Sequence, residues 1–141
     1  MALKSYIPSR VSVVVGSVTL EGLAEDSFVD AERKTDAFTS SVSNEGKVTR
    51  IKSSDRRGTI KVSLQGSSDS NDYLSTLAVT DDLTNVTTFP VIVKDNNGTD
   101  LATAPEAWIT KIPSLKKGKD LGKVEWTFEC AELIIFLGSN D

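Results

Sequence analysis

The sequence contains no histidine and only one cysteine among its 141 residues. Without histidine, the commonest general base and the commonest side-chain metal ligand are both missing, and no serine or cysteine nucleophile can pair with an imidazole. The single Cys130 excludes an intramolecular disulfide, and its place at the end of a strand-like stretch favours a small buried hydrophobe over a nucleophile. We therefore predict that the protein is not an enzyme and carries no cofactor.

Long apolar runs and an excess of positive charge are also missing. No stretch approaches the roughly 18 consecutive apolar residues of a membrane-spanning helix. Near the N-terminus, Ser12, Ser17 and Thr19 interrupt the apolar run. The apolar residues therefore recur with a period near two, as in a strand, and do not form the continuous apolar block of a secretion signal. The formal net charge is −4 and the sequence pI is about 4.9, which argues against general electrostatic binding of nucleic acid. We expect a soluble protein made in a cytoplasm, without membrane contact.

Two short segments resemble ligand-binding loops but lack their essential residues. The segment Asp95–Asp100 is rich in oxygen ligands, but the glycine and the final glutamate of an EF-hand are not at the required spacing. Gly118–Lys123 has one residue too few between its glycines for a phosphate-binding loop, and Val124 stands where serine or threonine is needed. We interpret the first segment as a hairpin turn and predict no metal site.

Alternating patterns predict short strands over most of the chain. In Thr59–Gln65, apolar residues alternate with hydroxyl and lysine side chains, so such a strand buries one face only. Turn residues such as Gly, Asn and Asp separate the strands, and Pro90 indicates an edge strand or a bulge. The expected strands are Arg10–Val15, Ser17–Glu21, Ser27–Lys34, Phe38–Asn44, Lys47–Ser53, Thr59–Gln65, Val86–Lys94, Glu106–Ile112, Gly122–Cys130 and Leu133–Leu137, with a turn over Gly22–Asp26.

The four consecutive strands between Ser27 and Gln65 are predicted to form a meander, and a helix over Asp72–Val79 follows it. Ser70 or Asn71 is the expected cap of this helix. Its apolar stripe is formed by Tyr73, Leu74, Leu77 and Ala78, and Tyr73, Leu74 and Leu77 are expected to pack against the β body. We therefore predict one domain over residues 1–141, all-β and mainly antiparallel, a β-sandwich or barrel with one short α-helix.

Charge is segregated along the chain. Lys47–Lys61 contains six basic residues and one acidic residue, Asp55, and Lys111–Lys123 contains five basic residues against Asp120. Acidic residues dominate most of the remaining sequence. Two interpretations stay open: these are solvated hairpin tips, or basic loops of one copy meet acidic surfaces of the next in a head-to-tail assembly.

Two segments of the sequence resemble a known protein family. The segment Asn44–Leu77, with its turn around Gln65 to Asn71 and the helical YLSTL, and the ending WTFECAELIIFLGSN are similar to the tail tube protein of contractile-tailed bacteriophages. That family is similar in fold to the tube protein of type VI secretion. The resemblance implies a structural virion protein of the phage tail, assembled in the host cytoplasm, whose copies form hexameric rings that stack into a hollow conduit for DNA ejection. The implied partners are further copies of the chain, the tail sheath protein, the baseplate or initiator and tail terminator proteins, and the tape measure protein and genomic DNA in the lumen.

Within this resemblance, strands between Phe38 and Gln65 are expected to form the tube wall. Lumen-lining carboxylates are expected at Asp30, Glu32 and Asp36, with solvated outward residues as the alternative. Contacts between rings are expected at a hairpin tip, with a plain mobile loop as the alternative. That tip comprises Lys52, Asp55, Arg56 and Arg57.

Two other functions stay open. A type VI secretion-like tube protein would differ by being secreted and by forming rings that stack less permanently. A non-enzymatic nucleic-acid-binding module would use the basic cluster Lys111–Lys123 and retain DNA in a salt-sensitive manner.

Overall fold

The computed structural model describes residues 3–24, 28–120 and 122–139. The elements are a 3-10 turn (Pro8–Arg10), β1 (Val11–Val15), β2 (Val18–Thr19), β3 (Val29–Arg33), β4 (Phe38–Val42), β5 (Val48–Lys52), β6 (Gly58–Gln65), α1 (Ser70–Thr84), β7 (Phe89–Asp95), β8 (Leu101–Ile109), β9 (Lys123–Cys130) and β10 (Ile134–Phe136). In the described residues, one eight-stranded sheet has the order β2-β1-β7-β8-β9-β6-β3 with β10 beside β8, and β4 pairs with β5 separately. All of these pairings are antiparallel.

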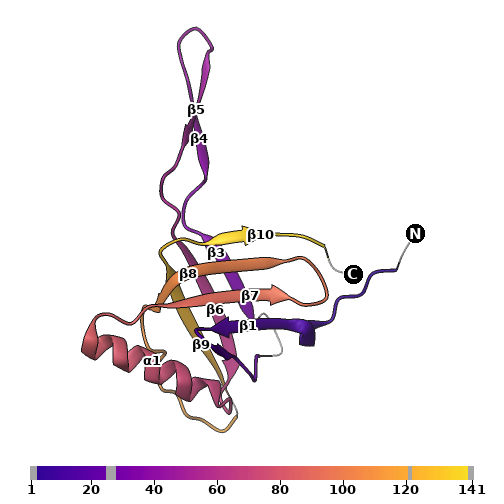
Figure 1. Cartoon of the computed structure of the whole chain (residues 1–141), viewed down its shortest axis with the longest axis vertical. Helices are drawn as coiled ribbons and strands as arrows, with labels where there is room; N and C mark the ends of the chain where they lie inside the picture. Colours follow the sequence, from indigo (N-terminus) through magenta and orange to yellow (C-terminus); the bar gives the residue numbers. More distant parts are fainter. Residues whose placement is uncertain (1–2, 25–27, 121, 140–141) are drawn as a thin grey trace.

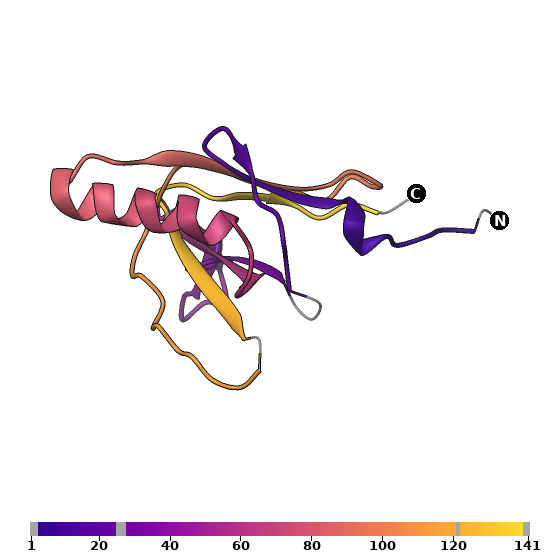
Figure 2. The same ribbon diagram turned by 90° about the horizontal axis from the view of Figure 1, so that it is seen from below.

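The large sheet turns at β8 and β9 to give two layers. β8 pairs with β7 along much of its length, but with β9 only through Ala107, Trp108 and Ile109. Figure 1 shows the front layer (β1, β2, β7, β8 and β10) crossing in front of the back layer (β3, β6 and β9), and Figure 2 shows the two layers from below. The strand order ends at β2 and β3, so over the described residues the body is an open sandwich rather than a closed barrel. The predicted antiparallel sandwich is confirmed, and the barrel alternative is wrong.

The hydrophobic core lies between the two layers. β6 contributes Ile60 and Val62, and β9 contributes Trp126 and Phe128, all of them at most 2% exposed. Fully burying side chains of this size stabilises a fold by about 1.5–3 kcal/mol each. Phe128 meets Phe89 of the front layer edge to face, with ring centroids 5.9 Å apart. The alternation seen in the sequence therefore places one side of each back-layer strand in the core.

Helix α1 extends beyond the predicted Asp72–Val79 at both ends. Thr76, Thr80 and Thr84 donate side-chain hydrogen bonds to carbonyl oxygens four residues earlier, at 2.9, 2.7 and 2.8 Å. These bonds accommodate β-branched hydroxyl residues inside the helix, a pattern that propensity alone does not favour. The helix ends at Asn85, which adopts the left-handed conformation with φ 62°. Within the described chain, no helix has the length and apolar character needed to cross a membrane.

The residues predicted to cap α1 make tertiary contacts instead, so that prediction was wrong. The residue before the helix makes no side-chain capping bond. Ser70 Oγ accepts a hydrogen bond from the Glu21 N–H at 2.9 Å. Asn71 Nδ2 donates to the Gln65 carbonyl at 3.0 Å, and Asn71 Oδ1 accepts from Trp126 Nε1 at 2.9 Å. The start of the helix is thus tied to β6 and β9.

The predicted apolar stripe of α1 faces the core. Leu74 is fully buried, and Ala78 belongs to the same cluster as side chains from both layers. Tyr73 and Leu77 are partly buried against this cluster, and Tyr73 Oη donates to the Val15 carbonyl at 3.1 Å. The helix therefore completes the core at one side of the open sandwich, beside the front layer in Figure 2.

The predicted meander is not formed. β3 pairs directly with β6, from Val29 opposite Val62 to Arg33 opposite Gly58. β4 and β5 leave the body between these strands as a projecting hairpin (Figure 1). Every side chain of both hairpin strands is exposed, because neither strand carries a continuous apolar face that the core would bury.

Other strand limits differ in smaller ways. β8 begins at Leu101 rather than at Glu106, because Ala102 and Ala104 supply small buried side chains that the sequence pattern did not reveal. Of the two alternatives predicted at Pro90, the bulge agrees with a register shift between Phe89 and Val91, whereas β7 is not an edge strand because it pairs with both β1 and β8. The turn after Asp95 joins β7 to β8, as predicted. Predicted assignments that fall on residues 25–27 and 121 lie outside the described residues.

Candidate functional site

The outer side of the back layer is a polar face. Its strands expose the residues that alternate with the core side chains, and cross-strand pairing aligns them, for example Asp30 with Lys61 and Lys61 with Thr127. Lys34 Nζ lies 2.7 Å from Glu129 Oε1 at one side of this surface. Four carboxylates and two lysines stand on the strands, so the polar face has a net negative charge. Its residues are Asp30, Glu32, Thr59, Lys61, Ser63, Gln65, Lys123, Glu125, Thr127 and Glu129.

Two of the three carboxylates predicted to line a lumen lie on this polar face. Asp30 and Glu32 are exposed on β3, the edge strand of the back layer. Asp36 is exposed in the loop between β3 and β4, away from the paired strands. Sequence reasoning missed Glu125 and Glu129, although the alternation of β9 around its buried aromatic residues marks both as outward-facing.

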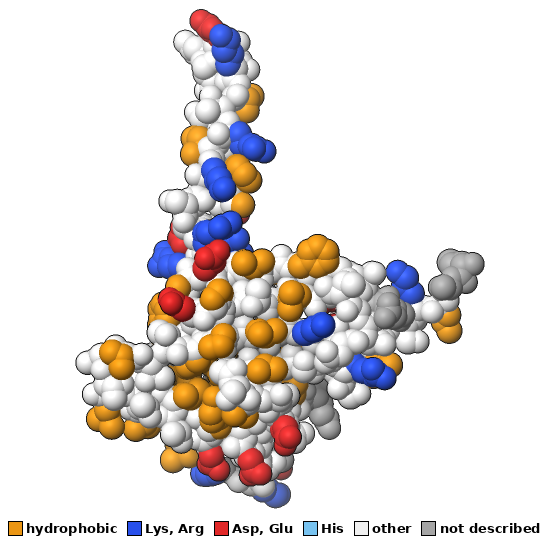
Figure 3. All heavy atoms as spheres, in the orientation of Figure 1, with side chains coloured by type: hydrophobic (Ala, Val, Ile, Leu, Met, Phe, Trp, Pro, Cys, Tyr) orange, Lys and Arg blue, Asp and Glu red, His pale blue; other side chains and the backbone are white. Residues whose placement is uncertain are grey.

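The outer side of the front layer has the opposite character. Strand register places Ile92 beside Val14, and both Ile134 and Phe136 beside outward residues of β8. Ile134 is 49% exposed and Phe136 is 60% exposed. Figure 3 shows a group of hydrophobic side chains over β7, β8 and β10. We call this surface the apolar face, and its residues are Val14, Ile92, Leu101, Ile134 and Phe136.

The hairpin of β4 and β5 also has two unlike sides. Directly opposed residues of an antiparallel pair share one side. One side therefore carries the pairs Phe38–Lys52, Ser40–Arg50 and Val42–Val48, and the other carries mainly hydroxyl residues with Ile51. The Arg50 guanidinium carbon lies 4.2 Å from the centroid of the Phe38 ring, in cation–π contact. The first side, which we call the cationic side, combines exposed apolar surface with positive charge.

The residues predicted to form the hairpin tip lie at its base instead. The tip is the turn from Ser43 to Lys47, whereas residues 53–57 return to the body. Arg57 holds Asp55 through two side-chain bonds, from Nε and Nη2, each 3.0 Å long. These bonds lower the pKa of Asp55 from 3.8 to about 2. The sequence showed the charge cluster but not its place, because strand length does not reveal where the chain leaves the core.

The same base is anchored to the C-terminal part of the body. Arg56 Nη1 lies 3.3 Å from Glu132 Oε1, and the Leu133 N–H donates to the Arg56 carbonyl at 2.9 Å. Arg33 Nη2 donates to the Asp55 carbonyl at 3.2 Å. These contacts fix the direction in which the hairpin projects.

Residues 111–120 of the basic segment after β8 form no strand. Residues 111–120 are exposed apart from the half-buried Pro113. The segment begins beside the C-terminal end of α1, where Lys111 and Ile112 line a hollow together with Asp81 and Asp82. Lys111 is thus brought near acidic residues of the helix, whereas Lys116 and Lys123 line a second hollow with Glu125 and Thr127 of the polar face.

The single cysteine belongs to the core. Cys130 is fully buried, and desolvation raises the pKa of its thiol to about 11. Among the described residues, no group of three or more acidic, cysteine or histidine side chains is placed to hold a metal ion.

A family model places the chain among phage tail tube proteins. The model described as "Bacteriophage PhiTE tail tube protein" matches residues 9–138, and the chain belongs to this family. The chain is similar to "Structural protein ORF10" of Pseudomonas phage KPP10, with 31% identity over 144 residues, covering 96% of this chain and 83% of that protein.

Solved structures with a similar fold come from contractile injection systems. The cap of the anti-feeding prophage tube has a TM-score of 0.65 at 14% identity, covering 96% of this chain and 94% of that one. The tube and sheath complex of an extracellular contractile injection system has a TM-score of 0.58 at 16% identity, covering 94% and 91%. At these identities the likeness establishes the fold, and the family membership establishes a structural protein of the phage tail.

Proposed function

We propose that this protein is the tube subunit of a contractile phage tail, in which hexameric rings stack into a hollow conduit for DNA. The observation that carries the proposal is the contrast between the two outer sides of one sandwich, polar on the back layer and apolar on the front layer. A tube wall needs this asymmetry, because its inner surface meets water and DNA while other surfaces meet protein.

The polar face lines the lumen in this proposal. Asp30, Glu32, Glu125 and Glu129 give it negative charge, and Asp36 lies near its rim at the start of the hairpin. Positive residues that neutralise phosphates release counterions and hold DNA in place. A wall with net negative charge avoids that retention and lets the DNA slide.

Ring closure uses the open edges of the sheet. β3 ends the strand order of the back layer, so one edge of Val29–Arg33 has no strand partner within the described chain. Exposed strand edges pair readily with other chains, and a closed ring of subunits removes them. The wall is then a sheet that continues from one subunit to the next.

Stacking between rings is assigned to the projecting hairpin. Lys52 lies on its cationic side, whereas Asp55, Arg56 and Arg57 hold its base and set its direction. We therefore still assign these four residues to stacking. Lys52 makes direct contact with the next ring, and the other three orient the hairpin. A double Arg56→Glu, Arg57→Glu variant should fold and form rings but stack poorly.

The solved structures of similar fold support a set of proposed partners. Solved structures of similar fold include a tube with its sheath and a sheath/tube terminator. We propose sheath and terminator proteins as partners outside and at the end of the tube, a baseplate initiator at the other end, and tape measure protein and genomic DNA inside. The proposed location is the virion tail, after assembly in the host cytoplasm. The phage family match favours this tube over a secretion-system tube.

Electron microscopy of the purified protein tests the proposal directly. Rings or hollow tubes are expected as concentration rises and salt is varied, and protein that stays monomeric even with its initiator complex would contradict the assignment.

A charge-reversal pair tests the lumen. Glu125→Lys should leave tubes intact but make them retain DNA in a salt-sensitive manner. Asp82→Lys, on the exposed side of α1, is the control with the same change in charge and should not. Equal DNA retention by the two variants would contradict the placement of the polar face in the lumen.

A further inference from the structure

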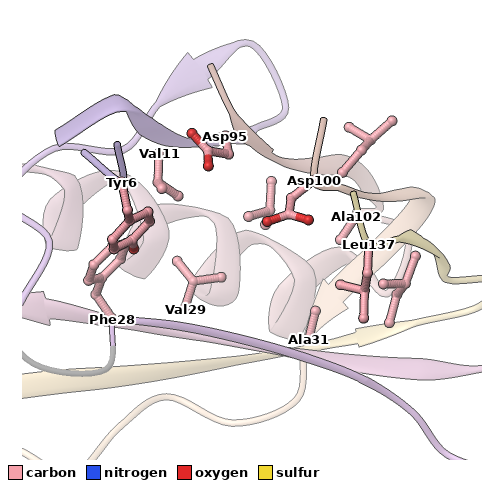
Figure 4. Close-up of a pocket in the computed structure, with 12 residues that line it drawn as sticks. Tyr6, Val11, Phe28, Val29, Ala31, Asp95, Asp100, Ala102 and Leu137 are labelled. Atoms are coloured by element: carbon pink, nitrogen blue, oxygen red, sulfur yellow. The ribbon is translucent and has the colours of Figure 1, made fainter. Parts of the chain in front are cut away.

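A cleft opens between the front layer and β3. The proposed tube wall gives this cleft no role. Its volume is about 390 Å³. Figure 4 shows apolar side chains such as Val11, Val29 and Ala31 on its walls, with the carboxyl groups of Asp95 and Asp100 directed toward the space. Pockets of ~300–1,000 Å³ hold small ligands, so this cleft has room for a few side chains rather than for a whole strand.

The two carboxylates of the cleft have backbone donors but no cationic partner among the described residues. Asp95 is 5% exposed, and its Oδ1 accepts from the Asn97 N–H at 2.9 Å. Asp100 Oδ1 accepts from the Gly138 N–H at 2.7 Å. The salt bridges of the described chain involve other carboxylates. Since a buried charge is costly without a counter-charge, the cleft suits an occupant that is both apolar and cationic.

The cationic side of the hairpin has this composition. Val42 is 68% exposed and Val48 is 70% exposed, with Phe38 at 44%. Arg50 and Lys52 stand between and beside these residues on the same side. A two-stranded ribbon with so much exposed apolar surface is marginal alone, so a covering partner is expected.

The hairpin extends away from its own body, so the complementary cleft must belong to a second copy (Figures 1 and 3). All side chains of β4 and β5 are exposed within one copy. A contact between two different surfaces of the same chain is heterologous, so it gives a closed ring or an open-ended array rather than a two-fold dimer. Stacked rings require such a contact.

We propose that the cleft of one subunit receives the cationic side of the hairpin from a subunit in the adjacent ring. This inference rests on the proposed stacking of rings. Phe38, Val42 and Val48 supply the apolar contact, and Arg50 and Lys52 face Asp95 and Asp100. The chain thereby carries both halves of its own inter-ring joint.

Mixed single-cysteine variants test this contact. Val48→Cys and Leu137→Cys are made in separate copies and mixed under mild oxidation, so that only an intermolecular disulfide can form between them. Leu137 lines the cleft, and Cys130 is buried and does not interfere. The control pairs Val48→Cys with Leu83→Cys, an exposed residue of α1.

The expected result is about tenfold more heterodimer for the cleft pair than for the control, because a contact raises the effective concentration of the two thiols. Equal yields for the two pairs would overturn the inference. If wild-type tubes form while the yields are equal, the tube function stands and only this joint is wrong. A strong cleft cross-link without rings or tubes would support the joint and contradict the tube.

A charge exchange provides a second test. Arg50→Asp and Asp100→Arg should each raise the concentration needed for stacking about tenfold or more, and the combined variant should recover much of the loss. Arg50 is exposed on the hairpin, so its replacement leaves the fold intact. Failure of the combined variant to recover any stacking would count against contact between these two residues.

Discussion

Replacing Asn71 tests how the helix is held to the back layer. Its side chain bonds to Trp126 Nε1 at 2.9 Å and to the Gln65 carbonyl at 3.0 Å. Trp126 is 2% exposed, so Asn71→Ala leaves a buried indole N–H without its acceptor, a loss of about 1–3 kcal/mol in the free energy of unfolding. The Gln65 carbonyl adds little, because it also accepts from the Ser68 N–H at 3.0 Å.

The assay is urea unfolding followed by circular dichroism, at a concentration where the protein is not assembled. A double-mutant cycle with Trp126→Phe separates the hydrogen bond from the cavity that the smaller ring leaves, and the expected coupling is ~1 kcal/mol. Asn71→Asp is the matched control, because it keeps an acceptor for the indole and should cost less than alanine. A coupling below about 0.3 kcal/mol would refute the role of this bond.

Three further predictions concern the core and the hairpin base. Leu74→Asp should prevent soluble folding, and Leu74→Ala should lower the free energy of unfolding by about 2–5 kcal/mol, measured by soluble yield and urea titration. Cys130 should resist alkylation at pH 8 in the folded protein and react once urea unfolds it, because its thiol pKa is raised to about 11; fast labelling of folded protein would contradict its burial. The pKa of Asp55 is lowered from 3.8 to about 2, so its stabilising contribution should be complete above pH 3.8 and be lost as pH falls toward 2. Arg57→Ala should return that titration toward 3.8, observed by NMR of the Asp55 carboxyl group, and an unchanged titration would contradict the pairing.

Local alternation predicted the back layer well. β6 and β9 bury every second residue, so both their limits and their inward faces can be read from the sequence. The sequence was less informative about which strands pair with each other. β3 pairs with β6 across the intervening hairpin, and no local pattern distinguishes this from a four-stranded meander.

The surfaces proposed for assembly were predictable in part for the same reason. Asp30 and Glu32 lie on the polar face because alternation on an edge strand fixes their side. The charge cluster at Lys52–Arg57 was visible, but its place at the hairpin base depends on contacts with Arg33 and Glu132, which are distant in sequence. The cleft acids were interpreted as ordinary turn residues, because their burial arises from β1, β3 and the C-terminal segment together.

In the proposed tube, ring closure and stacking would be mechanically connected. The edge strand β3 leads into the hairpin, and the Arg33 that ends β3 donates to the Asp55 carbonyl at the hairpin base. The Lys34 N–H donates to the Arg57 carbonyl at 3.1 Å, which joins the end of β3 to the chain returning from the hairpin. A neighbour that pairs with β3 therefore also bears on the segment that orients the hairpin. If the proposed rings form, these contacts would hold their hairpins in a fixed direction, so we expect lateral closure to favour axial growth.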